Sequence, residues 1–427
     1  MPAPEYLAGQ NGEGWDDRFR PEAVMECSDQ PTQQKALMSP MFQSFNLQGL
    51  RLRDRIVMAP LTRSRAGLKG VPTPMNAQYY AQRASCGLIV SEAAVVSPRG
   101  MGYLSTPGLY TEEQIAGWRL VTGAVHRAQG LMFAQLWHVG RVSHISLQPS
   151  GDAPLGPTNA AAQKLHTFAW TESGEPGEVS VSPPRALLVE EMEPIVQEFV
   201  QAAKNALRAG FDGLELLAAN GYLFDQFLNS NINTRTDEYG GQSPQTRARL
   251  LLETVDAICR EVKGVRLGVR LSPFGTFNNM PDDDKTEETL FFIAKELGSR
   301  GIAYVHFNDE PISIGHLNQA LVDNRQETEE GSTVSRRIPK RFLRTFKERF
   351  DGPIILCGAL TAETAKAMLN DGLADLVAFG IPFIANPDLP KRLLHGWDLT
   401  PPKTSLFYGG GEEGYIDYAC YEGSEVP

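Results

Sequence analysis

The feature that most constrains the fold is a short, strand-like apolar run that recurs eight times between helix-like segments. The runs cover residues 55–60, 88–94, 131–137, 213–220, 267–272, 303–307, 353–358 and 376–381. Because they are apolar almost throughout, both faces of each strand should be buried, which is typical of a parallel sheet. Eight strand–helix units therefore predict an α/β fold, the closed (β/α)8 or TIM barrel.

The segments between the runs carry helix signals. Before the fourth run, apolar residues recur at helical spacing from Met192 to Ala206, and Gly210 follows at a favoured helix end. An open, doubly wound sheet is the alternative arrangement. A glycine-rich turn after the first strand would favour that sheet, but the chain has Pro-Leu-Thr at residues 60–62.

Three segments depart from the repeat. Residues 1–40 contain Pro, Gly and acidic residues with weak periodicity, so we expect a flexible or loosely docked extension to a barrel domain of residues 41–427. Residues 142–184 follow the third strand and are rich in Pro, Gly and Ser, which predicts a cap over the barrel mouth where active sites form. The tail after Trp397 predicts no element beyond one short helix.

Composition limits the classes of binding partner that the chain can be expected to have. A net charge of -11 without a basic block argues against nucleic acid or an anionic membrane surface. No apolar run reaches the roughly 18 residues that a membrane span needs, and no signal-peptide pattern begins the chain. The five cysteines are scattered without a CxxC pair, which favours reduced thiols in the cytoplasm over disulfides or a metal site. A small-molecule substrate is the remaining expectation.

Barrel enzymes keep their chemistry at the C-terminal ends of the strands. In this sequence those positions hold hydrogen-bonding groups, one cation and two glycines, namely Thr62, Ala93, Gln135, residues 220–222, Arg270, Gly358 and Gly380. They include no Ser/His/Asp set and no cluster of metal ligands. Glycines after the last two strands allow backbone N–H groups to approach a phosphate. These residues alone predict a barrel that holds a phosphorylated planar cofactor or substrate.

Several longer strings resemble the Old Yellow Enzyme family. They are APLTRSR at 59–65, AQLWHVGR at 134–141, AANGYLFDQFLNSNINTRTDEYGG at 218–241, VRLSPFG at 269–275, IANPDLPKRL at 384–393 and FYGGGEEGYIDY at 407–418. They run in family order from about residue 41 to the C-terminus, and NTRTDEYGG is the most specific. The resemblance implies FMN as cofactor, NAD(P)H as reductant, an activated C=C bond as substrate, and a monomer or homodimer.

The resemblance also implies roles for single residues. Thr62 would bond the flavin carbonyl nearest N5, Gln135 would bond the pyrimidine edge, and Arg270 would place positive charge near N1 of the reduced, anionic flavin. Without the resemblance they would be interpreted as a strand-end cap, a core amide and half of a salt bridge. The remaining implied cofactor contacts are Ala59, Pro60, Leu61, Ala93, Gly358, Ala359, Gly380 and Tyr408.

The implied catalytic residues are Tyr222 and Asn220. A phenol with a pKa near 10 keeps its proton at neutral pH, so Tyr222 can protonate the substrate carbon. Asn220 matches one of the family's two donors to the substrate oxygen. Leu217, Asn220 and Tyr222 are the expected substrate contacts.

Two positions depart from the family pattern. Leu217 stands where the second donor, a histidine, is normally found, and losing such a donor costs on the order of 10²–10³ in rate. Ile381 stands where an arginine normally binds the FMN phosphate. A charged hydrogen bond is worth roughly 1.5–3 kcal/mol, so FMN affinity should fall about ten- to a hundredfold. Backbone N–H groups at Gly358, Ala359 and Gly380 could still hold the phosphate.

Three functions are compatible with a chain that retains most of these family residues and replaces two of them. The first is an NAD(P)H- and FMN-dependent reductase of an electron-poor alkene, acting on a specialised, bulky or apolar substrate in a biosynthetic pathway. The second is a non-redox isomerase or cyclase that uses Tyr222 as proton donor, with flavin structural or absent. The third is a catalytically silent, ligand-binding relative. The retained ring contacts and Tyr222 favour the first.

Overall fold

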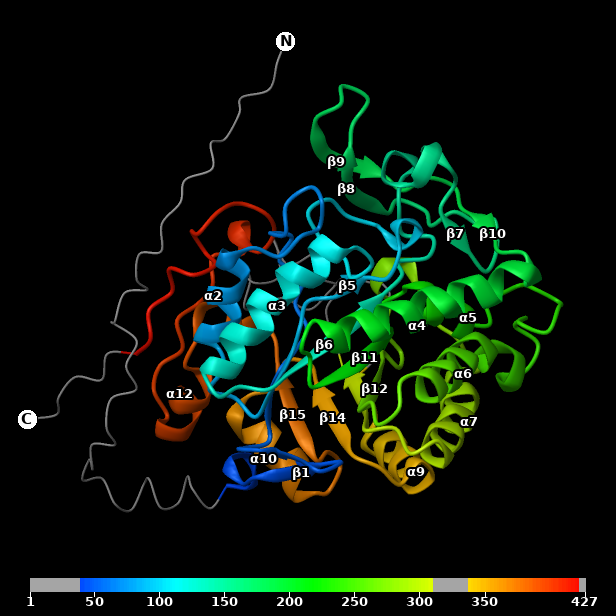
Figure 1. The fold of residues 1–427 in the computed structure, drawn as a ribbon. Helices are drawn as coiled ribbons and strands as arrows, with labels where there is room; N and C mark the ends of the chain where they lie inside the picture. The colour runs from blue at the N-terminus through cyan, green and yellow to red at the C-terminus, as the bar shows by residue number, and fades with distance from the viewer. Residues whose placement is uncertain (1–38, 310–336, 422–427) are drawn as a thin grey trace, which may run out of the picture.

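A computed structural model describes residues 39–309 and 337–421, and its centre is a closed parallel barrel (Figure 1). Its strands are β3 (Ile56–Met58), β4 (Leu88–Val90), β6 (Met132–Trp137), β11 (Gly213–Ala218), β12 (Leu267–Leu271), β13 (Tyr304–Asn308), β14 (Ile354–Cys357) and β15 (Leu376–Phe379). Each pairs with the next, β6 with β11 and β15 with β3, so the sheet has no edge. The predicted barrel is confirmed.

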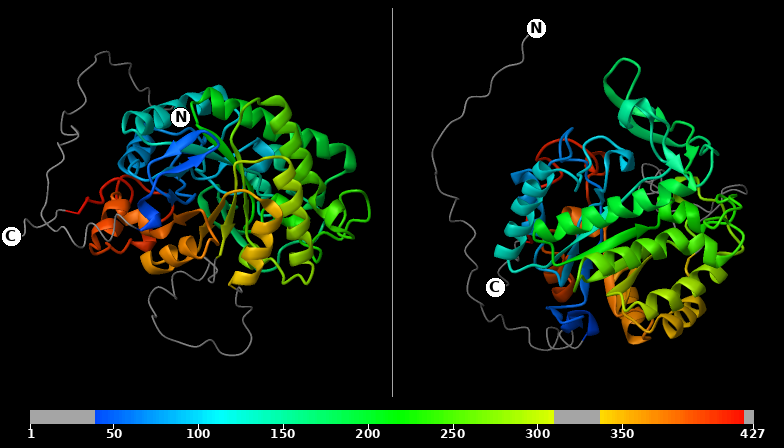
Figure 2. Two further views of the ribbon diagram at one scale, coloured as in Figure 1. Left: turned by 90° about the horizontal axis from the view of Figure 1, so that it is seen from below. Right: turned by 45° about the vertical axis from the view of Figure 1, so that its right-hand side comes forward.

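The helices form a ring outside the strands (Figures 1 and 2). They are α2 (Pro74–Gln82), α3 (Glu112–Arg127), α4 (Met192–Arg208), α5 (Leu223–Leu228), α6 (Pro244–Glu261), α7 (Thr286–Ser299), α9 (Lys340–Phe350), α10 (Ala362–Asn370), α11 (Ile381–Ala385) and α12 (Leu389–His395). Short 3-10 helices lie at Pro40–Phe42, Pro98–Gly100, Ile145–Leu147, Pro149–Gly151, Val189–Glu191, Phe277–Asn279 and Thr404–Leu406. In α4, Ile195, Phe199 and Ala203 are buried, as their spacing predicts.

The second predicted strand is shorter than expected. Residues 88–94 divide into β4 and a separate short strand, β5 (Ala94–Val95), which pairs with β6. Between these two strands, side-chain oxygens accept backbone N–H groups in place of the carbonyls of a neighbouring strand. The Gln135 N–H donates to Ser91 Oγ at 3.1 Å, and the Glu92 N–H donates to the Tyr80 hydroxyl at 2.9 Å. An apolar run cannot reveal such a break because the residues remain buried on both sides of it.

A β-hairpin closes the N-terminal end of the barrel. Its strands, β1 (Phe45–Leu47) and β2 (Leu50–Leu52), pair with each other in antiparallel register. Leu47 and Leu52 are fully buried against interior residues that include Phe133 and Tyr304. Strands of three residues leave too short a pattern for sequence analysis to detect. Among the described residues, this hairpin covers the N-terminal end of the barrel, which leaves the C-terminal end as the place for a ligand.

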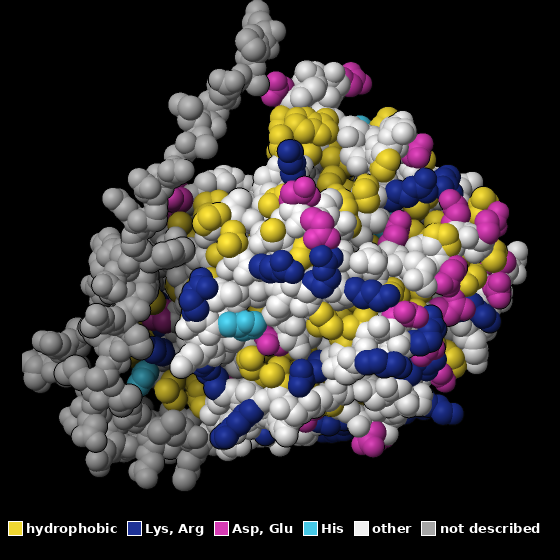
Figure 3. Space-filling view, viewed as in Figure 1, with side chains coloured by type: hydrophobic (Ala, Val, Ile, Leu, Met, Phe, Trp, Pro, Cys, Tyr) yellow, Lys and Arg dark blue, Asp and Glu magenta, His cyan; other side chains and the backbone are white. Residues whose placement is uncertain are grey.

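The predicted cap of residues 142–184 is more regular than a loop. It contains an antiparallel hairpin, β8 (His166–Trp170) with β9 (Pro176–Ser180), and β7 (Leu155–Gly156), which pairs with β10 (Arg185–Ala186). The hairpin rises above the barrel (Figure 2). Hydrophobic side chains gather over it on the face in Figure 3. Phe168, in β8, is 50% exposed. The cap is a folded β-structure.

The C-terminal tail returns to the loop after β3. The Arg63 guanidinium donates to the carbonyl oxygens of Phe407 and Gly414, each at 2.8 Å, and the Tyr415 ring stacks on Tyr79 at 4.1 Å. This docking brings Tyr408 to the barrel mouth. Residues 1–38 of the expected N-terminal extension lie outside the described residues. The flexible or loosely docked extension therefore stays a prediction. None of the described helices has the length and apolar composition of a membrane span.

Candidate active site at the barrel mouth

A polar layer crosses the barrel interior above its apolar core. Its centre is Glu215 on β11, which is fully buried. Gln135 Nε2 donates to one carboxylate oxygen at 2.7 Å. The Tyr304 hydroxyl and His306 Nδ1 donate to the other oxygen at 3.0 and 2.8 Å. Neighbouring strand registers place Gln135 beside Glu215, and Arg270 beside His306. Four strands thus contribute one connected network.

The network carries opposite charges at its centre. Burial raises the pKa of Glu215, but His306, Arg270 and the bond from Gln135 lower it more, so the pKa lies below its usual value and the carboxylate is ionised. Burial lowers the pKa of His306. Arg270 is buried, and within the described residues its Nε has no hydrogen-bond partner. A buried donor without a partner costs about 1–3 kcal/mol, so this guanidinium suits an acceptor atom brought by a ligand.

Glycines follow β14 and β15 and allow the backbone to pack closely against its neighbours at this corner. Gly358 has a φ of +134°, and a Cβ on it would overlap the Asp309 carbonyl oxygen. A Cβ on Gly380 would lie 3.2 Å from Leu61 Cδ2. The Ala59 N–H donates to the Phe379 carbonyl at 2.9 Å, which joins the loop after β3 to this corner. Predicted residues Ala59, Leu61 and Gly380 therefore do come together.

The loop after β3 places Thr62 at the mouth, and the docked C-terminal tail places Tyr408 there. Thr62 is half-buried in an irregular segment, next to Arg63, whose N–H donates to Glu92 Oε2 at 3.1 Å. The Gly409 N–H donates to the Arg63 carbonyl at 2.9 Å. The Tyr408 ring is 56% exposed at the rim. Pro60 is half-buried in the same loop.

An aromatic and apolar wall stands above the polar layer. Leu217, Ala93, Trp137 and Tyr222 belong to one buried cluster. The Tyr222 ring meets Trp137 edge-on at 4.9 Å. Its hydroxyl lies 3.3 Å from the Tyr103 hydroxyl, and burial raises the pKa of Tyr103 well above its usual value. Leu217 lines this wall without any group that could donate a hydrogen bond.

Asn220 occupies a turn that is held from several sides. Its φ is +60°, a left-handed conformation that asparagine tolerates better than most residues. Its N–H donates to Ser272 Oγ at 2.8 Å, and its carbonyl accepts from Asn278 Nδ2 at 2.8 Å. Behind the turn, Asp225 Oδ2 accepts from the Gly221 N–H at 2.8 Å. Burial raises the pKa of Asp225 to about 7.

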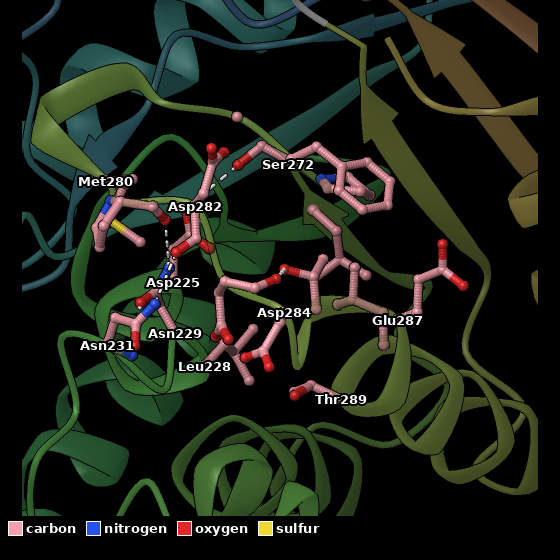
Figure 4. Close-up of a pocket in the computed structure, with 18 of the residues that line it drawn as sticks. Asp225, Leu228, Asn229, Asn231, Ser272, Met280, Asp282, Asp284, Glu287 and Thr289 are labelled. Carbon is pink, nitrogen blue, oxygen red and sulfur yellow. Dashed lines mark hydrogen bonds between the residues drawn. The ribbon is translucent and has the colours of Figure 1, made fainter. Parts of the chain in front are cut away.

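A cavity of about 670 Å³ lies beside this turn but is a different site. Figure 4 shows Asp225, Asp282, Asp284 and Glu287 on its walls, with Ser272 bonded to Asp225. None of the predicted site residues lines it. Its carboxylates would repel a phosphate. No group of three or more potential metal ligands occurs in residues 39–309 and 337–421.

Sequence analysis missed several residues of the mouth. Glu215 is a single acidic residue inside an apolar run, and that position was the available signal. Asn308 lies one residue beyond the sixth run, and Tyr103 lies in a loop, so neither had a local signal. They join the site only because the closed barrel brings distant strand ends together.

The fold is a TIM barrel whose mouth gathers a buried cation, hydrogen-bonding groups and an aromatic wall, and comparisons with known proteins identify its family. The NADH:flavin oxidoreductase / NADH oxidase family model matches residues 40–399. The chain is 38% identical to 12-oxophytodienoate reductase 1 of Oryza sativa subsp. japonica, covering 90% of this chain and 93% of the relative.

Solved structures are also similar. Morphinone reductase in complex with tetrahydroNAD has a TM-score of 0.81 and 43% identity, covering 91% of this chain and 99% of that one. The old yellow enzyme homologue of Zymomonas mobilis has a TM-score of 0.79 and 35% identity, covering 89% and 99%. The chain therefore belongs to the NADH:flavin oxidoreductase / NADH oxidase family, the Old Yellow Enzymes. It is an FMN-dependent oxidoreductase with a nicotinamide reductant.

Proposed function

We propose that this enzyme reduces the activated C=C bond of a bulky, largely apolar enone or enal in a specialised biosynthetic pathway. The observation that carries the proposal is the wall of Leu217, Ala93 and Trp137 beside the Tyr222 phenol. Apolar contact contributes about 25 cal/mol for each Å² removed from water. About 100 Å² of additional contact would therefore offset roughly 2.5 kcal/mol of a missing hydrogen-bond donor.

The residues of the mouth fit FMN in number and chemistry. Arg270 offers a buried cation whose Nε has no hydrogen-bond partner among the described residues, and backbone N–H groups after β14 and β15 are suitable donors for a phosphate. In this proposal Thr62, Gln135 and Arg270 bind the ring, and backbone groups at Gly358, Ala359 and Gly380 bind the phosphate. The remaining expected contacts are Ala59, Pro60, Leu61, Ala93 and Tyr408. Bound FMN, once reduced by NAD(P)H, supplies a hydride.

Protein groups supply the proton and the polarisation. Asn220 donates a hydrogen bond to the substrate oxygen, which draws electron density from the double bond. As the β-carbon receives hydride, the α-carbon takes the proton of the Tyr222 hydroxyl. The π bond is replaced by two C–H bonds, and one NAD(P)H is oxidised for each alkene reduced. Tyr103, 3.3 Å away, can pass a proton to the Tyr222 oxygen, and solvent supplies the proton that replaces it.

The experiment compares substrates of graded apolar size. Steady-state kcat/KM is measured for cyclohexenone and for cyclohexenones with longer alkyl substituents. We expect the larger ones to be preferred because Leu217 contacts apolar carbon. Leu217→His, which adds a donor and removes apolar contact, should reverse that order. A wild-type preference for the smallest enone, unchanged in the variant, would refute the substrate class.

A further inference from the structure

The side-chain amide of Asn220 is held by a second amide from a strand that is not its neighbour. Asn308, the last residue of β13, donates from Nδ2 to Asn220 Oδ1 at 2.9 Å. β13 pairs with β12, and β12 pairs with β11, which leads into Asn220. The contact therefore crosses above the end of β12, and Asn308 is almost fully buried where it does so.

The backbone of Asn220 already has little freedom. Its N–H and carbonyl are both bonded, to Ser272 Oγ and Asn278 Nδ2. Rotation of the side chain is the main freedom left to the residue. Because Asn308 donates to Oδ1, that rotation is restricted as well. The three contacting groups come from β13 and from the loop after β12.

The bond also selects which end of the amide faces the ligand. A side-chain amide has an accepting oxygen and a donating nitrogen, and its hydrogen-bond partners decide their orientation. With the Asn308 NH₂ facing it, turning Asn220 over would place two NH₂ groups against each other. The Asn308 bond therefore keeps the Asn220 oxygen on the Asn308 side and leaves its NH₂ as the donating end.

We propose that Asn308 is a positioning residue, which fixes Asn220 as the donor for the substrate carbonyl in a mouth where Leu217 cannot donate. The inference rests on the proposed reduction of an enone or enal. With two donors, a disordered one is partly compensated by the other. With one donor, its orientation decides how well the substrate is polarised, since a preorganised donor is worth on the order of 10²–10³ in rate.

The test is Asn308→Asp, with Asn370→Asp as the matched control on the exposed end of α10. An ionised carboxylate cannot donate to Asn220 Oδ1, and it attracts the Asn220 NH₂ away from the substrate. A protonated carboxyl can donate again, and burial at this position should raise the pKa of the introduced carboxyl toward the pH range of the assay. Each protein is reduced anaerobically with dithionite, and reoxidation by a cyclohexenone is followed in a stopped-flow instrument from pH 5.5 to 8.5.

We expect Asn308→Asp to slow reoxidation about a hundredfold at pH 8.5 and to recover at acid pH, while Asn370→Asp behaves as wild type. Combining Asn308→Asp with Asn220→Ala should cost no more than Asn220→Ala alone, because both act through one amide. Wild-type rates in Asn308→Asp, or fully additive losses, would overturn the inference. If Asn308→Asp fails to retain FMN, Asn308→Leu replaces it in the assay. Leucine lacks a donor at every pH, so this variant should lose rate without recovering at acid pH.

A ligand-binding measurement separates this inference from the proposed reaction. Benzamide, an unreactive planar carbonyl compound, is titrated into oxidised holoenzyme, and its dissociation constant is read from the flavin difference spectrum. We expect Asn308→Asp to weaken benzamide about tenfold at pH 8.5. If no enone reoxidises the wild type, the proposed function fails. If enones do reoxidise it but both measurements are unchanged in the variants, only the role of Asn308 fails.

Discussion

Replacing Glu215 with glutamine should destabilise the protein strongly. The carboxylate accepts hydrogen bonds from Gln135, Tyr304 and His306, and it is the buried counter-charge of Arg270. Glutamine keeps one accepting oxygen in nearly the same volume. At least one donor then loses its acceptor, and hydrogen bonds to charged groups contribute roughly 1.5–3 kcal/mol each. Removing one partner of a buried charge pair costs about 3–5 kcal/mol, which is the expected loss.

Urea unfolding of apoprotein, followed by circular dichroism, measures this loss directly. Glu112→Gln is the matched control, because Glu112 is exposed and only pairs with Arg208 on the surface. We expect no measurable change in that control. FMN affinity of Glu215→Gln should also fall, since Gln135 and Arg270 lose their common support. A loss of unfolding free energy below about 1 kcal/mol would refute the assignment of an ionised, fully bonded Glu215.

Three further predictions concern single positions. Because burial raises the folded-state pKa of Asp225 to about 7, well above its unfolded value, wild-type stability should fall as pH rises from about 4 to 7 and then level off. Asp225→Asn should remove that fall, and parallel stability curves from pH 5 to 8 would contradict it. Ile381→Arg should tighten FMN binding about ten- to a hundredfold in an apoprotein titration, and unchanged affinity would exclude phosphate from that corner. Tyr222→Phe should slow enone-driven reoxidation about 10²–10⁴-fold while leaving reduction by NADPH nearly intact. Tyr103→Phe should slow reoxidation less. Equal reoxidation rates in wild type and both variants would show that the Tyr222 phenol does not take part in the reaction.

The barrel could be predicted because its signal is local and repeated. Each strand is buried on both faces and mostly apolar, so eight runs are visible without knowledge of their partners. The hairpins were missed for a physical reason. In the β8–β9 hairpin, the β8 strand buries only alternate residues, and β9 is mostly exposed. The β1–β2 strands are three residues long and are stabilised by contact with the barrel interior rather than by their own pattern.

The candidate site was predictable in part. Thr62, Gln135 and Arg270 were predicted from their positions at strand ends, and the resemblance to a family gave them roles. Leu217 stood out because it departs from the pattern of that family. Their three-dimensional support was not predictable. Glu215 is hidden in an apolar run, and its partners Tyr304 and His306 lie on a strand two positions around the barrel. The contact between Asn220 and Asn308 joins residues 88 positions apart and has no trace in local periodicity.

The central claim is that the mouth of this barrel holds FMN through Thr62, Gln135 and Arg270 and passes electrons from a nicotinamide to an alkene. An anaerobic titration of FMN-loaded protein with NADPH, followed by addition of an alkyl-substituted cyclohexenone, tests it most directly. The account predicts that the visible flavin band bleaches with about one equivalent of NADPH and returns when the enone is added. A colourless protein that takes up no FMN, or a reduced flavin that no enone reoxidises, would contradict it.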